Sequence, residues 1–212
     1  MIRGVVFDFD GTLVDSMKII FEALNEALSK RNLPMIDLDL LGRMAGLPIN
    51  DIINAKMYVP EPTIKTIEKD VFKAYAGFCR MSCQLLPNVE NTLKVLKSKA
   101  VKLGLLTTTP RKPLKAVVRK LAIGKYFDIM LAKDDAKSKP DPDGLNQIIT
   151  EFGIRKNECL YVGDSPIDVL TGKAAGVRTI AITTGVTTTE QLKENKPDSI
   201  ITDMKQLLTL IN

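Results

Sequence analysis

Residues 4–16 have the sequence Gly-Val-Val-Phe-Asp-Phe-Asp-Gly-Thr-Leu-Val-Asp-Ser. The apolar run that ends at Phe7 is typical of a buried strand, and Asp8, Asp10 and a glycine follow it at once. Two carboxylates at the end of a buried strand repel each other, so they need a cation or a shared proton. A magnesium site is one interpretation, since Mg²⁺ binds one or two carboxylates together with substrate phosphate. An ordinary acidic Asp-Gly turn is the other.

Five further apolar runs with strand character follow along the chain, and helical patterns separate most of them. Together with Gly4–Phe7, the predicted strands are Val101–Leu106, Phe127–Leu131, Cys159–Val162, Thr179–Ile182 and Ser199–Ile201. Strands that alternate with helices are typical of an α/β fold with a mainly parallel sheet. The sequence therefore predicts this fold class.

The interval between the first two predicted strands is much longer than one crossover helix requires. It contains two apolar faces at helical spacing, and a structureless loop of that length would be improbable. We therefore expect residues 16–84 to form a small helical domain inserted after the first strand. Residues 1–15 and 85–212 would then form the core.

The composition excludes several kinds of chemistry. The chain contains no histidine, which rules out histidine general bases, histidine metal ligands and serine–histidine triads. Its apolar runs are far shorter than the roughly 18 residues of a membrane span, so no membrane partner is expected. The first strand begins directly after the N-terminus, and the chain has an odd set of three cysteines. We therefore expect a reduced, cytoplasmic protein.

Residues 85–125 are strongly basic, with ten Lys and Arg against one Glu, in a chain of net charge +5. Such a stretch could bind nucleic acid. The cations, however, fall between the apolar positions of two predicted helices, which is typical of solvated helix faces. We favour that interpretation and expect no nucleic-acid partner.

Three more polar clusters follow predicted strands, namely Thr107–Pro110, Lys137–Pro142 and Gly163–Asp168. The carboxyl ends of parallel strands meet at one edge of an open sheet, where ligands bind. Hydroxyl, ammonium and carboxylate groups would therefore converge there with Asp8 and Asp10. This is the composition of a magnesium–phosphate site.

Each cluster also has a purely structural interpretation. Thr107–Thr109 could cap the following helix through a hydroxyl, and Lys139 could face solvent from a loop. Asp168 follows Ser165 at the spacing of a capping box, so it could serve to start a helix. All of these would have to coincide at one edge of one sheet, and we therefore favour the joint functional interpretation.

The order and spacing of these motifs resemble the haloacid dehalogenase-like hydrolase superfamily, and most of all its phosphoglycolate phosphatase branch. The resemblance implies a Rossmann-like, doubly wound parallel sheet with a helical cap inserted after the first strand. It also implies a magnesium-dependent phosphatase that hydrolyses a small phosphate monoester through an aspartyl-phosphate. The expected partner is a small phosphorylated metabolite, and the expected assembly is a monomer or homodimer.

The resemblance assigns Asp8 as nucleophile and Asp10 as general acid and base. Residue chemistry agrees, because a carboxylate can attack phosphorus without losing a proton. Mg²⁺ would be bound by Asp8, Asp164 and the carbonyl of Asp10. These three residues would form the metal site.

The same resemblance assigns the phosphate contacts to Thr107, Thr108 and Lys139. Many relatives have Asn or Asp where this chain has Thr108, so a backbone N–H there would have to serve. Asp168 would orient ligands or metal-bound water without binding the metal itself.

The cap should supply substrate specificity. Glycines flank Arg43 within Leu41–Pro48, which could be a loop that presents the guanidinium to an acidic substrate tail. Equally, Arg43 could face solvent between two helices. A phosphomutase of the β-phosphoglucomutase kind and an inorganic pyrophosphatase remain alternative activities on the same core.

Overall fold

A six-stranded parallel sheet forms the centre of the molecule, with the strand order β3-β2-β1-β4-β5-β6. The computed structural model describes residues 1–211, apart from the side chains of residues 80 and 82. The strands are β1 (Gly4–Phe7), β2 (Lys102–Leu106), β3 (Ile129–Leu131), β4 (Cys159–Gly163), β5 (Arg178–Ile182) and β6 (Ser199–Ile201). The predicted α/β class with a Rossmann-like parallel sheet is confirmed.

Two strands start later than predicted, because the preceding helical turns take up their first apolar residues. Val101 donates its N–H to the carbonyl of Leu96, which closes the end of a helix. Phe127 donates its N–H to Gly124 at the end of a short 3₁₀ helix. An N–H group used in this way cannot join the ladder of the sheet.

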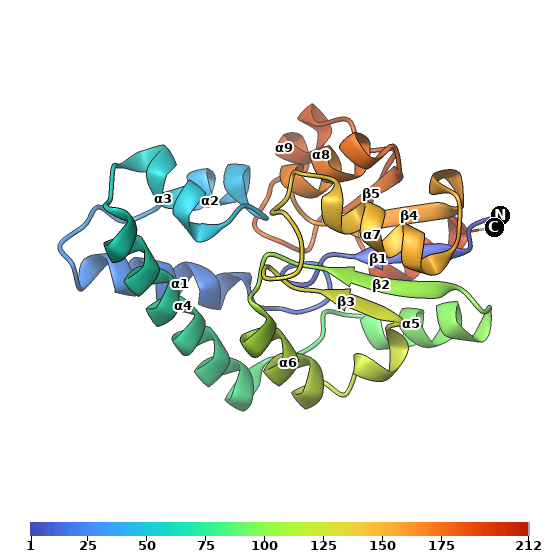
Figure 1. Cartoon of the computed structure of the whole chain (residues 1–212), viewed down its shortest axis with the longest axis horizontal. Coiled ribbons are helices and arrows are strands. Elements are labelled where there is room, and N and C mark those ends of the chain that lie inside the picture. Colours follow the sequence, from blue (N-terminus) through green and yellow to red (C-terminus); the bar gives the residue numbers. More distant parts are fainter. Residues whose placement is uncertain (212) are drawn as a thin grey trace.

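Helices cover both faces of the sheet (Figure 1). The alternation of side chains along β1 shows the two layers, since Val5 and Phe7 pack in one hydrophobic cluster and Val6 packs in another. The first cluster includes α5 (Val89–Ser98) and α6 (Arg111–Lys120), and the second includes α7 (Asp143–Phe152) and α8 (Pro166–Ala175). The remaining core elements are α9 (Thr189–Glu194) and the 3₁₀ helices η1 (Gly124–Tyr126), η2 (Lys156–Glu158) and η3 (Met204–Thr209).

Four helices between β1 and α5 lie beyond the carboxyl ends of the strands, at the left of Figure 1. They are α1 (Met17–Ser29), α2 (Leu38–Met44), α3 (Ile49–Lys56) and α4 (Glu61–Ser82). Their apolar faces form a hydrophobic cluster of their own, which includes Leu24, Leu28, Ile53 and Ile67. This arrangement fits the proposed cap. Within the described residues, no helix combines the length and the apolar character that crossing a membrane requires.

Candidate active site

The order of the sheet reverses between β1 and β4, which is where open α/β sheets bind ligands. Phe7 is paired in register with Val162, so both strands end at the same level. Asp8 follows β1 directly and Asp164 follows β4 directly. The topology therefore brings together two carboxylates that lie far apart in the chain.

Three carboxylates converge at this point, because Asp168 joins Asp8 and Asp164. One oxygen of each lies within 4.8 Å of the others, and none of the three residues is more than 5% exposed. Lys139 lies among them, with Nζ 2.6 Å from Asp8 Oδ1 and 2.7 Å from Asp168 Oδ1. The structural alternative for Lys139, a loop lysine that faces solvent, was therefore wrong, because the residue is only 3% exposed. Three carboxylates against one ammonium leave an excess of negative charge in a buried place.

The pKa values reflect this excess. Burial raises the pKa of Asp8 to about 7 against the opposing effect of Lys139, and Asp168 adds to the rise. Burial, followed by the charges of Asp8 and Asp168, raises the pKa of Asp164 well above its usual range. Burial works against the charge of Lys139, yet Asp168 and Asp8 hold its pKa above its ordinary value, so it stays an ammonium.

A divalent cation fits the donors of this cluster. Asp8 and Asp164 offer hard oxygen ligands, and a bound cation would compensate the surplus negative charge. Thr12 Oγ1 donates to Asp164 Oδ1 at 2.7 Å and fixes that carboxylate. Gly11 has φ +83°, and a Cβ there would collide with the Asp164 carboxylate. A glycine is therefore required where the loop passes the site.

The Asp168 carboxylate is already engaged by neighbouring donors. Oδ1 accepts from Lys139 Nζ and from Tyr161 Oη at 2.8 Å, and Oδ2 accepts from Ser165 Oγ at 2.5 Å. Ser165 Oγ also accepts from the Asp168 N–H, so the capping box that starts α8 is present as well. Asp168 thus serves both to start α8 and to hold Lys139.

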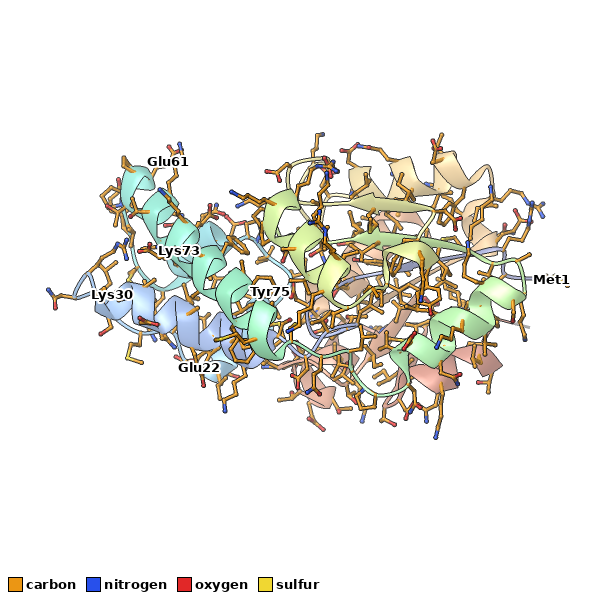
Figure 2. All side chains as sticks on the ribbon, turned by 90° about the horizontal axis from the view of Figure 1, so that it is seen from below. Met1, Glu22, Lys30, Glu61, Lys73 and Tyr75 are labelled. Atoms are coloured by element: carbon orange, nitrogen blue, oxygen red, sulfur yellow. The ribbon has the colours of Figure 1, made fainter. Side chains whose placement is uncertain are left out.

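The Asp10 carboxylate lies where α1 and α4 meet the loops at the ends of the strands. Its Oδ1 accepts from Ser16 Oγ at 2.6 Å and from Tyr75 Oη at 2.8 Å, and its Oδ2 accepts from Thr109 Oγ1 at 2.5 Å. Ser16 precedes α1, Tyr75 belongs to α4 and Thr109 precedes α6. Figure 2 shows Tyr75 toward the end of α4 that meets the core, with Glu61 at the opposite end.

The segment after β2 borders the same site. Thr107 and Thr108 both line the cavity described below. Thr107 Oγ1 accepts from the N–H of Thr109 at 3.0 Å, which holds the turn. The alternative that these hydroxyls cap α6 was wrong, because the N-cap position is Pro110 and the Thr109 hydroxyl donates to Asp10.

A cavity of about 60 Å³ lies between the core and the cap helices. One water needs roughly 10–15 Å³ by the same measure, so the space suits a ligand of a few heavy atoms. The core side of the lining includes the acidic cluster, Thr107–Thr109 and Lys133. The cap side is largely apolar and includes Leu41, Ala45–Ile49, Ile52 and Phe72.

Arg43 does not belong to that lining among the described residues. It lies within α2, so the prediction of a loop around it was wrong. Asp37 caps that helix by accepting from the N–H of Leu40 at 2.8 Å, and the helix continues past Arg43. The guanidinium is 57% exposed and pairs with Asp39 at 3.0 Å, one turn earlier. The neighbouring residues of the segment, Leu41 and Ala45–Pro48, do line the cavity.

Sequence reasoning missed three polar side chains at the site. Tyr75 occupies the apolar face of its helix, and nothing in that pattern shows which hydrophobic position carries a hydroxyl to Asp10. Ser16 was expected only as the first residue of the helical insert. Lys133 follows β3 at the same edge as the other clusters, which is a signal that could have identified it.

Comparison with known proteins agrees with this geometry. Residues 5–182 match the family model of the haloacid dehalogenase-like hydrolases. A phosphoglycolate phosphatase of Photorhabdus laumondii is 31% identical over 99% of this chain and 92% of its own length. That of Haemophilus influenzae is 32% identical over 97% of this chain and 96% of its length.

A solved structure shows the same fold. A haloacid dehalogenase-like hydrolase from Bacteroides fragilis superimposes with a TM-score of 0.87 at 27% identity, covering 98% of this chain and all of the other. The matched residues include the whole acidic cluster, since Asp8, Asp164 and Asp168 all fall within 5–182. The chain therefore belongs to the haloacid dehalogenase-like hydrolase family, in a branch similar to the phosphoglycolate phosphatases, and its enzyme class is phosphoric monoester hydrolase.

Proposed function

We propose that the protein is a magnesium-dependent phosphatase that hydrolyses a small phosphate monoester, such as phosphoglycolate, through an aspartyl-phosphate. The observation that carries this proposal is the buried cluster of Asp8, Asp164 and Asp168 around Lys139, at the switch point of the sheet and beside a small cavity. The phosphoglycolate phosphatases to which the chain is similar support the choice of substrate class.

Asp8 is the proposed nucleophile. Its carboxylate needs no base to remove a proton, and the chain has no histidine to act as one. Asp8, Asp164 and the carbonyl of Asp10 would hold Mg²⁺, whose charge offsets the repulsion between an anionic nucleophile and an anionic phosphate. Lys139 opposes the rise in the pKa of Asp8 that burial causes, and its 2.6 Å contact orients the carboxylate.

The phosphoryl oxygens are proposed to contact Lys139 and the Thr107–Thr108 segment. Positive charge and hydrogen-bond donors there stabilise the charge that spreads over the equatorial oxygens in the transition state. Asp10 donates a proton to the leaving alkoxide and then removes one from the water that cleaves the aspartyl-phosphate. Such acid–base assistance typically contributes about 10²–10⁴-fold.

The small cavity supports a small substrate. Its volume of about 60 Å³ includes the proposed phosphoryl site, so the leaving group that it holds would be small. Apolar cap residues close it on one side, and they would exclude water during transfer. Hydrolysis of a phosphoprotein as efficient as that of small esters would contradict this part of the proposal.

The test is phosphate release from small phosphate esters and pyrophosphate, with magnesium and with EDTA. We expect magnesium-dependent release by the wild type and a loss of at least about 10³-fold in Asp8→Asn, because the nucleophile is removed. Asp15→Asn is the matched control, since Asp15 is an exposed carboxylate of the same segment and should retain activity. Acid-quenched wild type should carry one phosphoryl group on the peptide that contains Asp8. Full activity of Asp8→Asn would refute the mechanism.

A further inference from the structure

Of the described residues that line the active-site cavity, only Lys133 carries a positive charge. The other charged lining residues are the carboxylates of the reaction site, Asp8, Asp10, Asp164 and Asp168, and most of the rest are apolar. Lys139 lies beneath this surface, held between Asp8 and Asp168. A second negative group on a substrate would therefore meet one favourable partner in the cavity.

The backbone holds Lys133 in place at the mouth of the site. Its N–H donates to the carbonyl of Thr109 at 3.1 Å, which joins the segment after β3 to the segment after β2. Next to it, the N–H of Ala132 donates to Asp135 Oδ2 at 2.8 Å, and Asp135 is ion-paired with Arg111. This network fixes the Cα of Lys133 relative to the phosphate-binding turn.

The ammonium of Lys133 reaches across to the cap. Nζ lies 2.8 Å from Oε1 of Glu68 on α4, one turn before Phe72, which also lines the cavity. The two side chains are only 26% and 20% exposed, so the pair lies at the edge of the cavity and not on the open surface. Because both side chains keep some contact with solvent, a ligand anion could take the place of the Glu68 carboxylate on Lys133.

We infer that Lys133 determines substrate specificity by binding a second anionic group, a carboxylate or a second phosphoryl group, on the leaving group. In the free enzyme Glu68 takes the place of that anion. This inference rests on the proposed phosphatase function and adds to it the class of leaving group. It also transfers to Lys133 the role that the sequence suggested for Arg43, whose guanidinium pairs with Asp39 outside the cavity lining.

Steady-state kinetics of Lys133→Met test the inference. Three substrates are compared: 2-phosphoglycolate with a carboxylate, pyrophosphate with a second phosphoryl group, and glycerol 2-phosphate with a neutral leaving group. We expect KM for at least one of the two anionic substrates to rise by about 10-fold or more, because a hydrogen bond to a charged group is lost. Values of kcat should stay within about 3-fold, and kcat/KM for glycerol 2-phosphate within about 2-fold.

Three further variants separate binding from structure. Lys133→Arg keeps the charge and should restore most of the affinity for the anionic substrates. Glu68→Gln removes the competing carboxylate and should lower KM for those substrates, or leave it unchanged. Lys97→Met is the matched control, because Lys97 forms a similar pair with Asp128 at 2.9 Å away from the cavity. This variant should leave kcat and KM unchanged for all three substrates.

The outcomes are distinguishable from failure of the proposed function. If the wild type releases no phosphate from any of the esters, the phosphatase proposal itself falls. If the wild type is active and Lys133→Met lowers kcat/KM equally for all three substrates, the Lys133–Glu68 pair only stabilises the position of α4. The specificity inference is then wrong. Selective loss with 2-phosphoglycolate alone identifies the carboxylate as the ligand, and selective loss with pyrophosphate alone identifies the phosphoryl group.

Discussion

At the scale of single residues, the surroundings of Asp10 connect the parts of the molecule. Its carboxylate accepts hydrogen bonds from three hydroxyl groups. They belong to Ser16 before α1, Tyr75 on α4 and Thr109 after β2. Tyr75 is fully buried, and its hydroxyl lies 2.8 Å from Asp10 Oδ1. A hydroxyl in this place restricts the rotamer of the proposed general acid, so it positions a catalytic group without touching substrate.

For Tyr75→Phe we expect kcat to fall about 10-fold, because a hydrogen bond to a charged group contributes roughly 1.5–3 kcal/mol. KM should change less than about 2-fold, since the hydroxyl is expected to act on Asp10 and not on the phosphate contacts. Tyr126→Phe is the matched control, because it removes a hydroxyl that donates to the Glu90 carboxylate at 3.0 Å, outside the site. Steady-state kinetics of both variants check the prediction, and an equal loss in the two would contradict it.

At the scale of elements, the turn after α2 approaches the start of α8 closely. Gly46 has φ +88° and lines the cavity, and a Cβ there would lie 2.7 Å from Ser165 Oγ. Ser165 in turn caps α8 and donates to Asp168. The close approach therefore brings a cap loop against the element that supports the buried cluster.

We expect Gly46→Ala to lower the free energy of unfolding by about 1–2 kcal/mol, because L-residues disfavour left-handed backbone. It should also lower kcat/KM at least about 10-fold, since the methyl group would displace the loop from Ser165. Gly153→Ala is the control for backbone strain alone, because Gly153 has φ +61° and no neighbouring atom within 4 Å of its Cβ position. Denaturation and kinetics should show a similar loss of stability in both variants and a loss of activity only in Gly46→Ala.

At the scale of the whole molecule, the buried carboxylates oppose folding when no cation is bound. The pKa of Asp8 is about 7 in the folded state and 3.8 for an ordinary carboxyl, so the folded state binds the extra proton. Its contribution to stability therefore declines as pH rises from about 4 to about 7. The raised pKa of Asp164 acts in the same direction. Mg²⁺ should relieve this cost, and protons should compete with it.

We therefore expect Mg²⁺ to raise the melting temperature more at pH 8 than at pH 5.5. At a concentration of about 100 times Kd, binding adds about 2.7 kcal/mol, which corresponds to roughly 5–10 °C at pH 8 for a chain of this size. Thermal denaturation with magnesium and with EDTA measures the shift. Asp8→Asn should lose most of the shift and should melt higher than the wild type in EDTA at pH 8. Equal shifts at both pH values in the wild type would show that the cluster does not bind the metal.

Several features of the site followed from local sequence. Asp8, Asp164 and Lys139 each follow a strand, and parallel strands end at one edge, so their meeting could be predicted once the strands were recognised. The capping spacing of Ser165 and Asp168 was also visible, and the structure contains that box. The joint arrangement of Asp8, Asp164 and Lys139 could be known only from the strand order, which places β1 next to β4.

The contacts between cap and core could not be predicted in the same way. Tyr75 contacts Asp10 and Glu68 contacts Lys133 because of how α4 is rotated about its axis and where it packs on the core. A hydrophobic pattern specifies which face of a helix is buried, but not which residue of the core that face meets. Arg43 is a different case, because the sequence left open both a loop beside the substrate and a position facing solvent, and its partner Asp39 lies four residues earlier in the same helix.

The sequence by itself determined the parallel α/β core, because strand periodicity and turn residues are local properties of the chain. The same local patterns predict a helical insert and the residues that are proposed to carry the chemistry. Only the tertiary structure decided that Tyr75 donates to Asp10 and that Lys133 pairs with Glu68 at the edge of the cavity. These contacts depend on how two separately packed layers meet, and that docking is set by the shapes of both surfaces together.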